Sequence, residues 1–93
     1  MELDDYRAEL DAIDKALEEG FIARMELVKK IGEYKAEHGL PTLDAGREAA
    51  VIDMHTENCP DELKPYMTYY FKTLMALSRN LQEQLAVERS RRE

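Results

Sequence analysis

The sequence predicts an all-α protein with three helices per chain, in the order long, short, long. Apolar residues recur at alternating steps of three and four over long stretches, which is the period of one helix face. The three prolines lie in two places, and these places divide the chain into three segments. A chain of 93 residues with 44% hydrophobic and 35% charged residues is typical of one small, soluble, helix-rich domain.

The first helix is expected over residues 3–37. Its apolar stripe continues in phase through Gly20 and Gly32, and no proline interrupts it. Gly39 and Pro41 follow at the usual positions of a C-terminal cap and a stop signal. The main members of the stripe are Leu3, Leu10, Leu17, Phe21, Val28 and Ile31, and Ile13, Leu27 and Tyr34 widen it.

The second helix is expected over residues 45–56, with Asp44 as its N-cap. The capping box is imperfect there, because Glu48 lies one position beyond the acidic site of that motif.

The third helix is expected over residues 61–88. It either begins at Pro60 and bends or becomes regular only after Pro65, and the sequence leaves both starts open. Residues 89–93 are expected to form a solvated, frayed tail.

The first helix is too long for a single compact chain. About 34 residues at 1.5 Å per residue span about 51 Å, whereas a globule of this chain length is about 30 Å across. The stripe stays apolar along the overhang, so a second chain is expected to cover it. A symmetric homodimer is the commonest arrangement, and the alternative is a monomeric three-helix hairpin with one frayed end.

Charge, hydropathy and cysteine content limit the partners. The net charge of −7 argues against nucleic acid, and no run approaches the ~20 apolar residues of a membrane span. The acidic N-terminus is not typical of a secretory signal, and the single Cys59 favours the reducing cytoplasm. No metal-ligand spacing, nucleophile–base pair or glycine-rich phosphate loop occurs, so neither metal nor cofactor is expected. An enzyme of this kind would act by positioning and fixed charge.

Several polar side chains share the apolar helix faces. Taken singly, each has an ordinary structural explanation, such as an arginine that reaches water or pairs with an acid. Taken together, the cations outnumber the acids, and a dianionic ligand would balance them through arginine forks that suit carboxylates. The set comprises Arg7, Asp14, Arg24 and Lys35 on the first helix, Arg47 and Glu48 on the second, and Ser78 and Gln82 on the third.

The order and spacing of these residues resemble the all-helical chorismate mutases of the AroQ class. The pattern R-x6-D-x9-R-x10-K is followed by D-x-x-R-E and then by S-x-x-x-Q. The segments RMELVKKIGEYKAEHGLP and CPDELKPYMTYYFKTLMALSRNLQ are similar to the short, single-domain bacterial members, and the resemblance covers about residues 3–85. The matching positions are Arg7, Asp14, Arg24, Lys35, Asp44, Arg47, Glu48, Ser78 and Gln82.

The resemblance implies an intertwined helical homodimer of the chorismate mutase II type, acting in the biosynthesis of phenylalanine and tyrosine. It implies conversion of chorismate to prephenate by a [3,3] sigmatropic rearrangement. Arg24 and Arg47 would hold the substrate carboxylates, and Arg7 would reach the site from the partner chain. Lys35 and the amide N–H of Gln82 would meet the ether oxygen, which gains negative charge in the transition state.

The remaining matches would complete this site. Glu48 would accept a hydrogen bond from the ring hydroxyl and help to orient Lys35. Ser78 and the backbone near Asp44 would complete the carboxylate pocket. Asp14 is interpreted as structural, orienting an arginine.

Two other functions stay open. An isochorismate-pyruvate lyase shares this fold, but such lyases tend to lack the acid after the second-helix arginine, so Glu48 favours the mutase. A non-catalytic helical interaction module would pair the stripe cations with acids of a partner. Ser78 and Gln82 would bring such a module no advantage.

Overall fold

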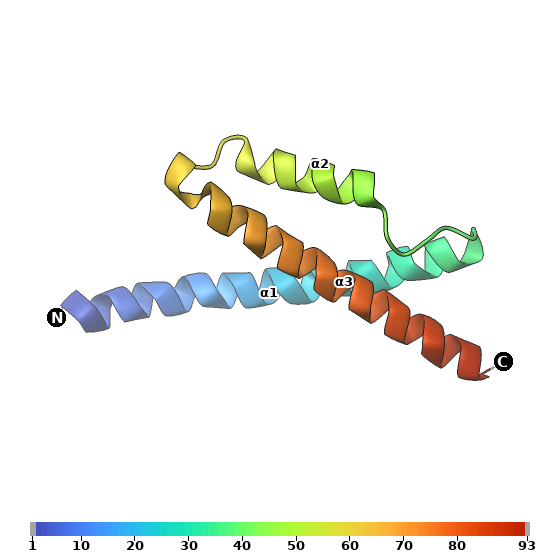
Figure 1. Cartoon of the computed structure of the whole chain (residues 1–93). Coiled ribbons are helices and arrows are strands. Elements are labelled where there is room, and N and C mark those ends of the chain that lie inside the picture. Colours follow the sequence, from blue (N-terminus) through green and yellow to red (C-terminus); the bar gives the residue numbers. More distant parts are fainter. Residues whose placement is uncertain (1, 93) are drawn as a thin grey trace.

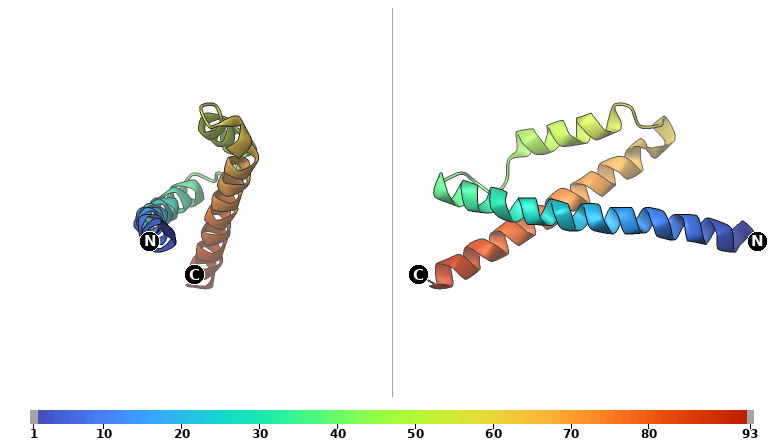
Figure 2. Two further views of the ribbon diagram at one scale, coloured as in Figure 1. Left: turned by 90° about the vertical axis from the view of Figure 1, so that its left-hand side faces the viewer. Right: turned by 180° about the vertical axis from the view of Figure 1, so that it is seen from behind.

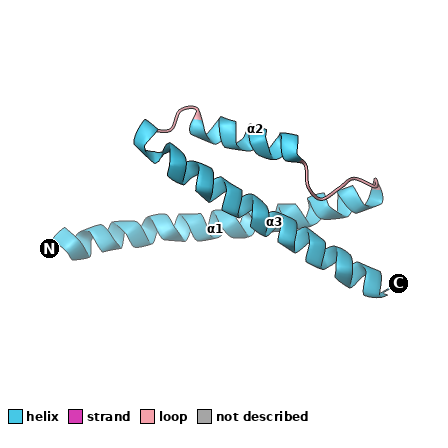
Figure 3. Cartoon of the chain, viewed as in Figure 1, coloured by secondary structure: helices cyan, strands magenta, loops and turns pink. Residues whose placement is uncertain are grey.

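The computed structural model describes residues 2–92, which form three α-helices and one 3₁₀ turn (Figures 1 and 3). The predicted all-α class and the long, short, long order are confirmed, and residues 2–92 contain no β-strand. Helix α1 spans Glu2–Glu37, α2 spans Ala45–Thr56, the 3₁₀ turn η1 spans Asp61–Leu63, and α3 spans Lys64–Arg92.

Helix α1 ends where the sequence predicts a glycine cap. Gly39 has a φ of 64°, in the left-handed region that glycine adopts without strain. The N–H of Leu40 donates to the carbonyl of Lys35 at 2.8 Å, and the N–H of Gly39 donates to that of Ala36 at 3.4 Å. These two bonds are those of a Schellman motif, and they satisfy carbonyls that the helix end would otherwise leave free.

Asp44 caps the N-terminus of α2, as predicted. Its carboxylate accepts a hydrogen bond from the backbone N–H of Arg47 at 3.0 Å. The capping box is not completed, because the Glu48 carboxylate turns toward Arg79 on α3.

The structure shows where α3 starts, which the sequence left open, and it corrects the expected position of its end. The turn η1 comes first, the regular helix begins at Lys64, and Pro65 lies in its first turn, where a missing N–H removes no helical hydrogen bond. The frayed tail expected over residues 89–93 is wrong for its described part, since α3 continues through Arg92. Three arginines in the last turn complement the negative end of the helix dipole. Glu93 lies outside the described residues.

Helix α3 holds the chain together. It packs against both α1 and α2, whereas α1 and α2 make no close backbone contact with each other within residues 2–92. Figures 1 and 2 show α1 and α3 crossing and then diverging on both sides of the crossing. A Cβ built on Gly32 of α1 would lie 3.1 Å from Cγ of Gln82, so glycine permits the close approach. The buried residues of the described chain are Val28, Met75 and Ser78, and each keeps 5–7% of its surface exposed.

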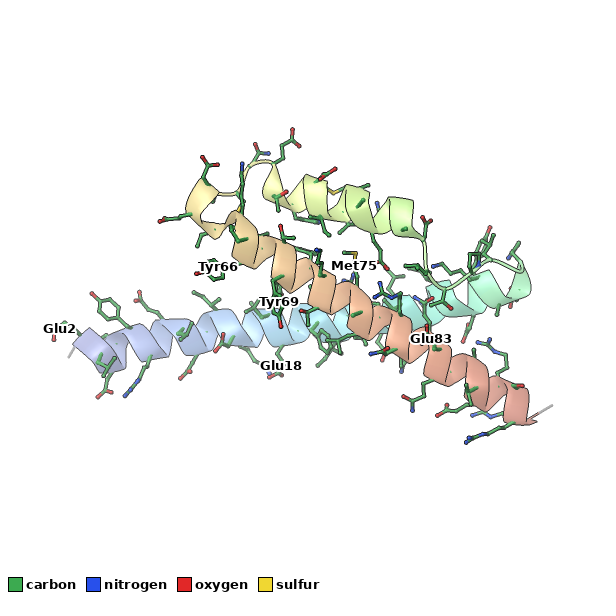
Figure 4. All side chains as sticks on the ribbon, in the orientation of Figure 1. Glu2, Glu18, Tyr66, Tyr69, Met75 and Glu83 are labelled. Carbon is green, nitrogen blue, oxygen red and sulfur yellow. The ribbon has the colours of Figure 1, made fainter. Side chains whose placement is uncertain are left out.

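The chain is extended, and much of its apolar surface is uncovered. It measures 58 × 28 × 14 Å, and its radius of gyration is 16.9 Å, compared with about 12 Å for a compact chain of this length. Every described residue of α1 before Arg24 is exposed, including Leu17 at 51%. On α3, Tyr66 and Tyr69 project on the side of α1 and are 72% and 74% exposed (Figure 4).

Within residues 2–92 no helix combines the length and apolar character needed to cross a membrane.

The uncovered stripe yields a prediction about assembly. Leu17→Glu is expected to break a dimer, because it places a charge in the middle of the stripe. Burying one leucine side chain is worth about 1.5–3 kcal/mol and a symmetric dimer has two copies, so Kd should rise on the order of a hundredfold or more. Light scattering against concentration measures this change.

Ala12→Glu is the matched control, since it adds the same charge on the opposite face of α1. If the parent has the mass of one chain, 10.8 kDa, at all accessible concentrations, the predicted dimer is wrong.

Candidate functional site

A cavity of about 270 Å³ lies between the three helices and is lined in part by the loop from α1 to α2. Its apolar walls include Val28, Ile31, Val51 and Met75. The structure brings seven of the eight predicted substrate-binding residues into this lining, although they are spread over 59 positions of sequence. These seven are Arg24, Lys35, Asp44, Arg47, Glu48, Ser78 and Gln82.

Arg7 is the predicted site residue that the chain does not bring to its own cavity. It lies 17 residues before Arg24 on the same helix, which is about 26 Å along the axis. Its side chain is 67% exposed and lies 3.9 Å from Asp4. Asp14, expected to orient an arginine, forms no ion pair within residues 2–92, so that expectation is not met inside one chain.

The guanidinium of Arg24 is held by α3. Its Nη1 donates to the hydroxyl oxygen of Ser78 and, at 3.4 Å, to the carbonyl oxygen of Leu74. The buried Ser78 hydroxyl in turn donates to the same carbonyl at 2.9 Å. Arginine has five N–H donors, so most of them stay available to a ligand. The guanidinium is therefore preorganised rather than free to swing.

Lys35 is oriented by the backbone. Its Nζ donates to the carbonyl oxygen of Thr42 at 2.8 Å, and two further N–H donors remain. The expectation that Glu48 orients Lys35 is wrong in this structure. Lys35 lies next to the loop after α1, so its ammonium donates to a loop carbonyl. The Glu48 carboxylate instead accepts hydrogen bonds from the guanidinium of Arg79 on α3.

Arg79 is a cavity residue that the sequence analysis missed. Its Nη1 donates to both carboxylate oxygens of Glu48. This hydrogen bond, together with the charges of Glu48 and Glu83, raises the pKa of Arg79 against the lowering effect of burial. A signal was available, because Arg79 follows Met75 by four residues and precedes Gln82 by three, which are the steps of one helix face.

Gln82 lines the cavity and lies close to Gly32 of α1. Its side-chain oxygen is buried and accepts no hydrogen bond from the described residues. A buried amide oxygen without a partner costs about 1–3 kcal/mol, and such an atom marks a position where a bound molecule or water would be stabilising.

The cavity has a surplus of positive charge. Arg24, Lys35, Arg47 and Arg79 line it, against the two carboxylates of Asp44 and Glu48. Two formal positive charges therefore remain in a chain whose net charge is −7. The described residues contain no group of three or more His, Cys, Asp or Glu side chains that could hold a metal ion. Such a cavity is suited to an organic dianion of small size.

The known proteins that are similar to about half of the chain include two T-proteins and one mutase. The T-proteins of Haemophilus influenzae and Enterobacter agglomerans are 42% and 41% identical over 50 and 51 residues, which are 54% and 55% of this chain. A 4-amino-4-deoxychorismate mutase of Streptomyces venezuelae is 42% identical over 52 residues, or 56% of this chain. These matches cover 13%, 14% and 50% of the respective relatives, so the chain spans half of their length or less.

No solved structure matches the chain. At the level of families the match is broader, since the model described as chorismate mutase type II covers residues 6–83. This span contains all nine positions of the sequence pattern, from Arg7 to Gln82. The chain therefore belongs to the chorismate mutase type II family.

Proposed function

We propose that the protein is a chorismate mutase, an isomerase that converts chorismate to prephenate by a [3,3] sigmatropic rearrangement. The observation that carries the proposal is the single cavity in which seven residues of the family pattern meet, with two positive charges in surplus. Chorismate has two carboxylates, so its charge is opposite in sign to that surplus, to which Arg7 of a second copy would add one more positive charge. The rearrangement is intramolecular and requires no nucleophile, metal or cofactor.

In this mechanism, Arg24 and Arg47 bind the substrate carboxylates. Arg24 is ready to do so, because Ser78 and the carbonyl of Leu74 already hold its guanidinium. Binding at both ends restrains the substrate in a conformation close to that of the transition state, which removes much of the entropic barrier.

Lys35 and Gln82 act at the ether bond that breaks. Negative charge grows on the ether oxygen in the transition state, and an ammonium and an amide N–H held nearby stabilise it more than they stabilise the ground state. The Thr42 carbonyl positions Lys35, and Gly32 lets Gln82 lie close to α1. These contacts hold both donors in place, so little reorganisation is required during the reaction.

A homodimer completes the proposed site. Arg7 lies on the exposed half of α1, far from the cavity of its own chain, so it would reach the cavity of a second copy. The uncovered stripe of α1 and the exposed Tyr66 and Tyr69 of α3 are the surfaces that such a copy would cover.

A second candidate substrate is 4-amino-4-deoxychorismate, because a protein named for that activity is 42% identical over 52 residues. The isochorismate-pyruvate lyase stays less favoured, since Glu48 is present on the cavity wall. A non-catalytic module is also less favoured, because it would not explain why several cations and the buried amide of Gln82 line one cavity.

Incubation of the purified protein with chorismate tests the function directly. We expect the ultraviolet absorbance of chorismate to disappear with turnover and prephenate to accumulate in equal amount. Loss of chorismate no faster than in buffer would overturn the proposal, and release of pyruvate would indicate a lyase.

Gln82→Glu tests the proposed contact with the ether oxygen. A carboxylate there would repel the developing negative charge at neutral pH, and only the protonated form donates a hydrogen bond. Loss of one such donor costs about 2.7–4 kcal/mol, so kcat/KM at pH 7.5 should fall on the order of a hundredfold or more. Activity should recover as pH falls through the pKa of the introduced carboxyl group, while the parent profile stays flat.

Gln84→Glu is the matched control, because it adds the same charge to α3 at an exposed position outside the cavity. A Gln82→Glu enzyme with the activity and pH profile of the parent would show that residue 82 does not meet the reacting oxygen.

Complementation tests the shared site. Arg7→Ala and Lys35→Ala chains should each be nearly inactive alone. Co-expression should restore about a quarter of the parent's activity, since random pairing makes half of the dimers hybrids and each hybrid has one intact site. Hybrid dimers that are isolated by two affinity tags and remain inactive would show that Arg7 and Lys35 do not serve the same site across two chains.

A further inference from the structure

The ion pair between Arg79 and Glu48 forms part of the cavity wall and joins α3 to α2. The side chains of Arg79 and Glu48 are 30% and 25% exposed, so the pair is half-buried and not a solvated surface contact. Both oxygens of Glu48 accept from one nitrogen of Arg79, which fixes the carboxylate relative to the cavity. The family pattern that the sequence displays does not include Arg79.

Glu48 is the carboxylate best placed to receive a donor from a ligand. Of the two carboxylates that line the cavity, Asp44 already caps α2 through the N–H of Arg47. A carboxylate has about four lone-pair sites, so Glu48 can still accept one hydrogen bond beside those from Arg79. The ligand would then donate to the Glu48 carboxylate, whose negative charge the Arg79 guanidinium already balances.

This inference rests on the proposed function, and it concerns the ring substituent at position 4. Chorismate has a hydroxyl there, and the compound named for the Streptomyces relative has an amino group in its place. Such an amine is largely protonated near neutral pH. A hydroxyl donates a neutral hydrogen bond, whereas an ammonium adds a positive charge to a cavity that already has two in surplus.

We propose that Arg79 is a specificity-determining residue that balances the charge of Glu48 and thereby selects a hydroxyl over an amino group at position 4 of the substrate ring. With Arg79 in place, an ammonium at Glu48 faces a guanidinium a few ångströms away and gains little from the shared carboxylate. Without it, Glu48 presents a free negative charge that an ammonium binds more strongly than a hydroxyl does.

The test measures kcat/KM for chorismate and for 4-amino-4-deoxychorismate in five purified proteins. These are the parent, Arg79→Gln, Arg79→Met, Arg79→Lys and the control Arg91→Gln, which removes one positive charge from an exposed position of α3 outside the cavity. Two neutral variants are used so that, if one of them folds poorly, the other still allows the ratio to be measured. Circular dichroism and light scattering establish that each protein is folded and has the parent's mass.

We expect the parent to prefer chorismate and both neutral variants to shift the ratio of the two kcat/KM values toward the amino compound by tenfold or more. Arg79→Lys keeps the charge and should keep most of the preference, and Arg91→Gln should leave the ratio unchanged. A structural role would lower both activities together and would not move the ratio.

Four outcomes overturn the inference. A parent that prefers the amino compound, or neutral variants whose ratio stays within twofold of the parent, shows that Arg79 does not select the substituent while leaving the mutase function intact. A ratio that shifts equally in Arg79→Lys shows that charge is not the cause. Turnover of neither compound by the folded parent overturns the proposed function and this inference with it.

Discussion

The crossing of α1 and α3 is the constraint on which the site depends. At this crossing Gly32 brings the backbone of α1 close to the Gln82 side chain, and Val28 and Met75 are buried nearby. A larger residue at position 32 would separate the helices or displace Gln82. Because Arg24 and Lys35 lie on α1 while their cavity partners lie on α3 and α2, any change in this approach moves charges relative to one another.

The cavity trades stability for preorganisation. Four cations line one partly enclosed space and repel one another, two carboxylates offset only part of this repulsion, and the unpaired oxygen of Gln82 adds a further cost. The contacts of Arg24 with Ser78, Lys35 with Thr42 and Arg79 with Glu48 hold most of these charges in place. Fixed charges of this kind stabilise charge that develops during a reaction without first having to reorient.

The same geometry leaves the single chain with little core. Val28, Met75 and Ser78 are its buried residues within the described part, none of them completely buried, and the described residues of α1 before Arg24 are exposed to solvent. Hydrophobic burial is the main favourable term in folding, so a chain with this little burial gains most by association. In the proposed dimer, one event would cover the stripe of α1 and bring Arg7 to the second site, so stability and catalysis would depend on the same interface.

The sequence by itself determined the helices and most of the polar residues of the cavity. The cap at Asp44, the turn at Gly39 and the apolar period are local signals, because each depends on residues within one or two turns. Periodicity also indicates which way a side chain points around its own helix, and it singled out Arg24, Lys35, Ser78 and Gln82. The resemblance to the family pattern supplied Asp44, and together with Arg47 and Glu48 at the start of the second helix these residues line one cavity.

Only the tertiary structure decided which charges pair. Glu48 meets Arg79 instead of Lys35, and Lys35 meets the carbonyl of Thr42, because these choices depend on the crossing of α1 and α3 and on the path of the loop. Helix period contains no information on the distance between two helices, and a difference of a few ångströms determines the partner of a cation. The position at which α3 ends was also not predictable from composition. It depends on whether the interaction of the last arginines with the helix dipole outweighs fraying of the end.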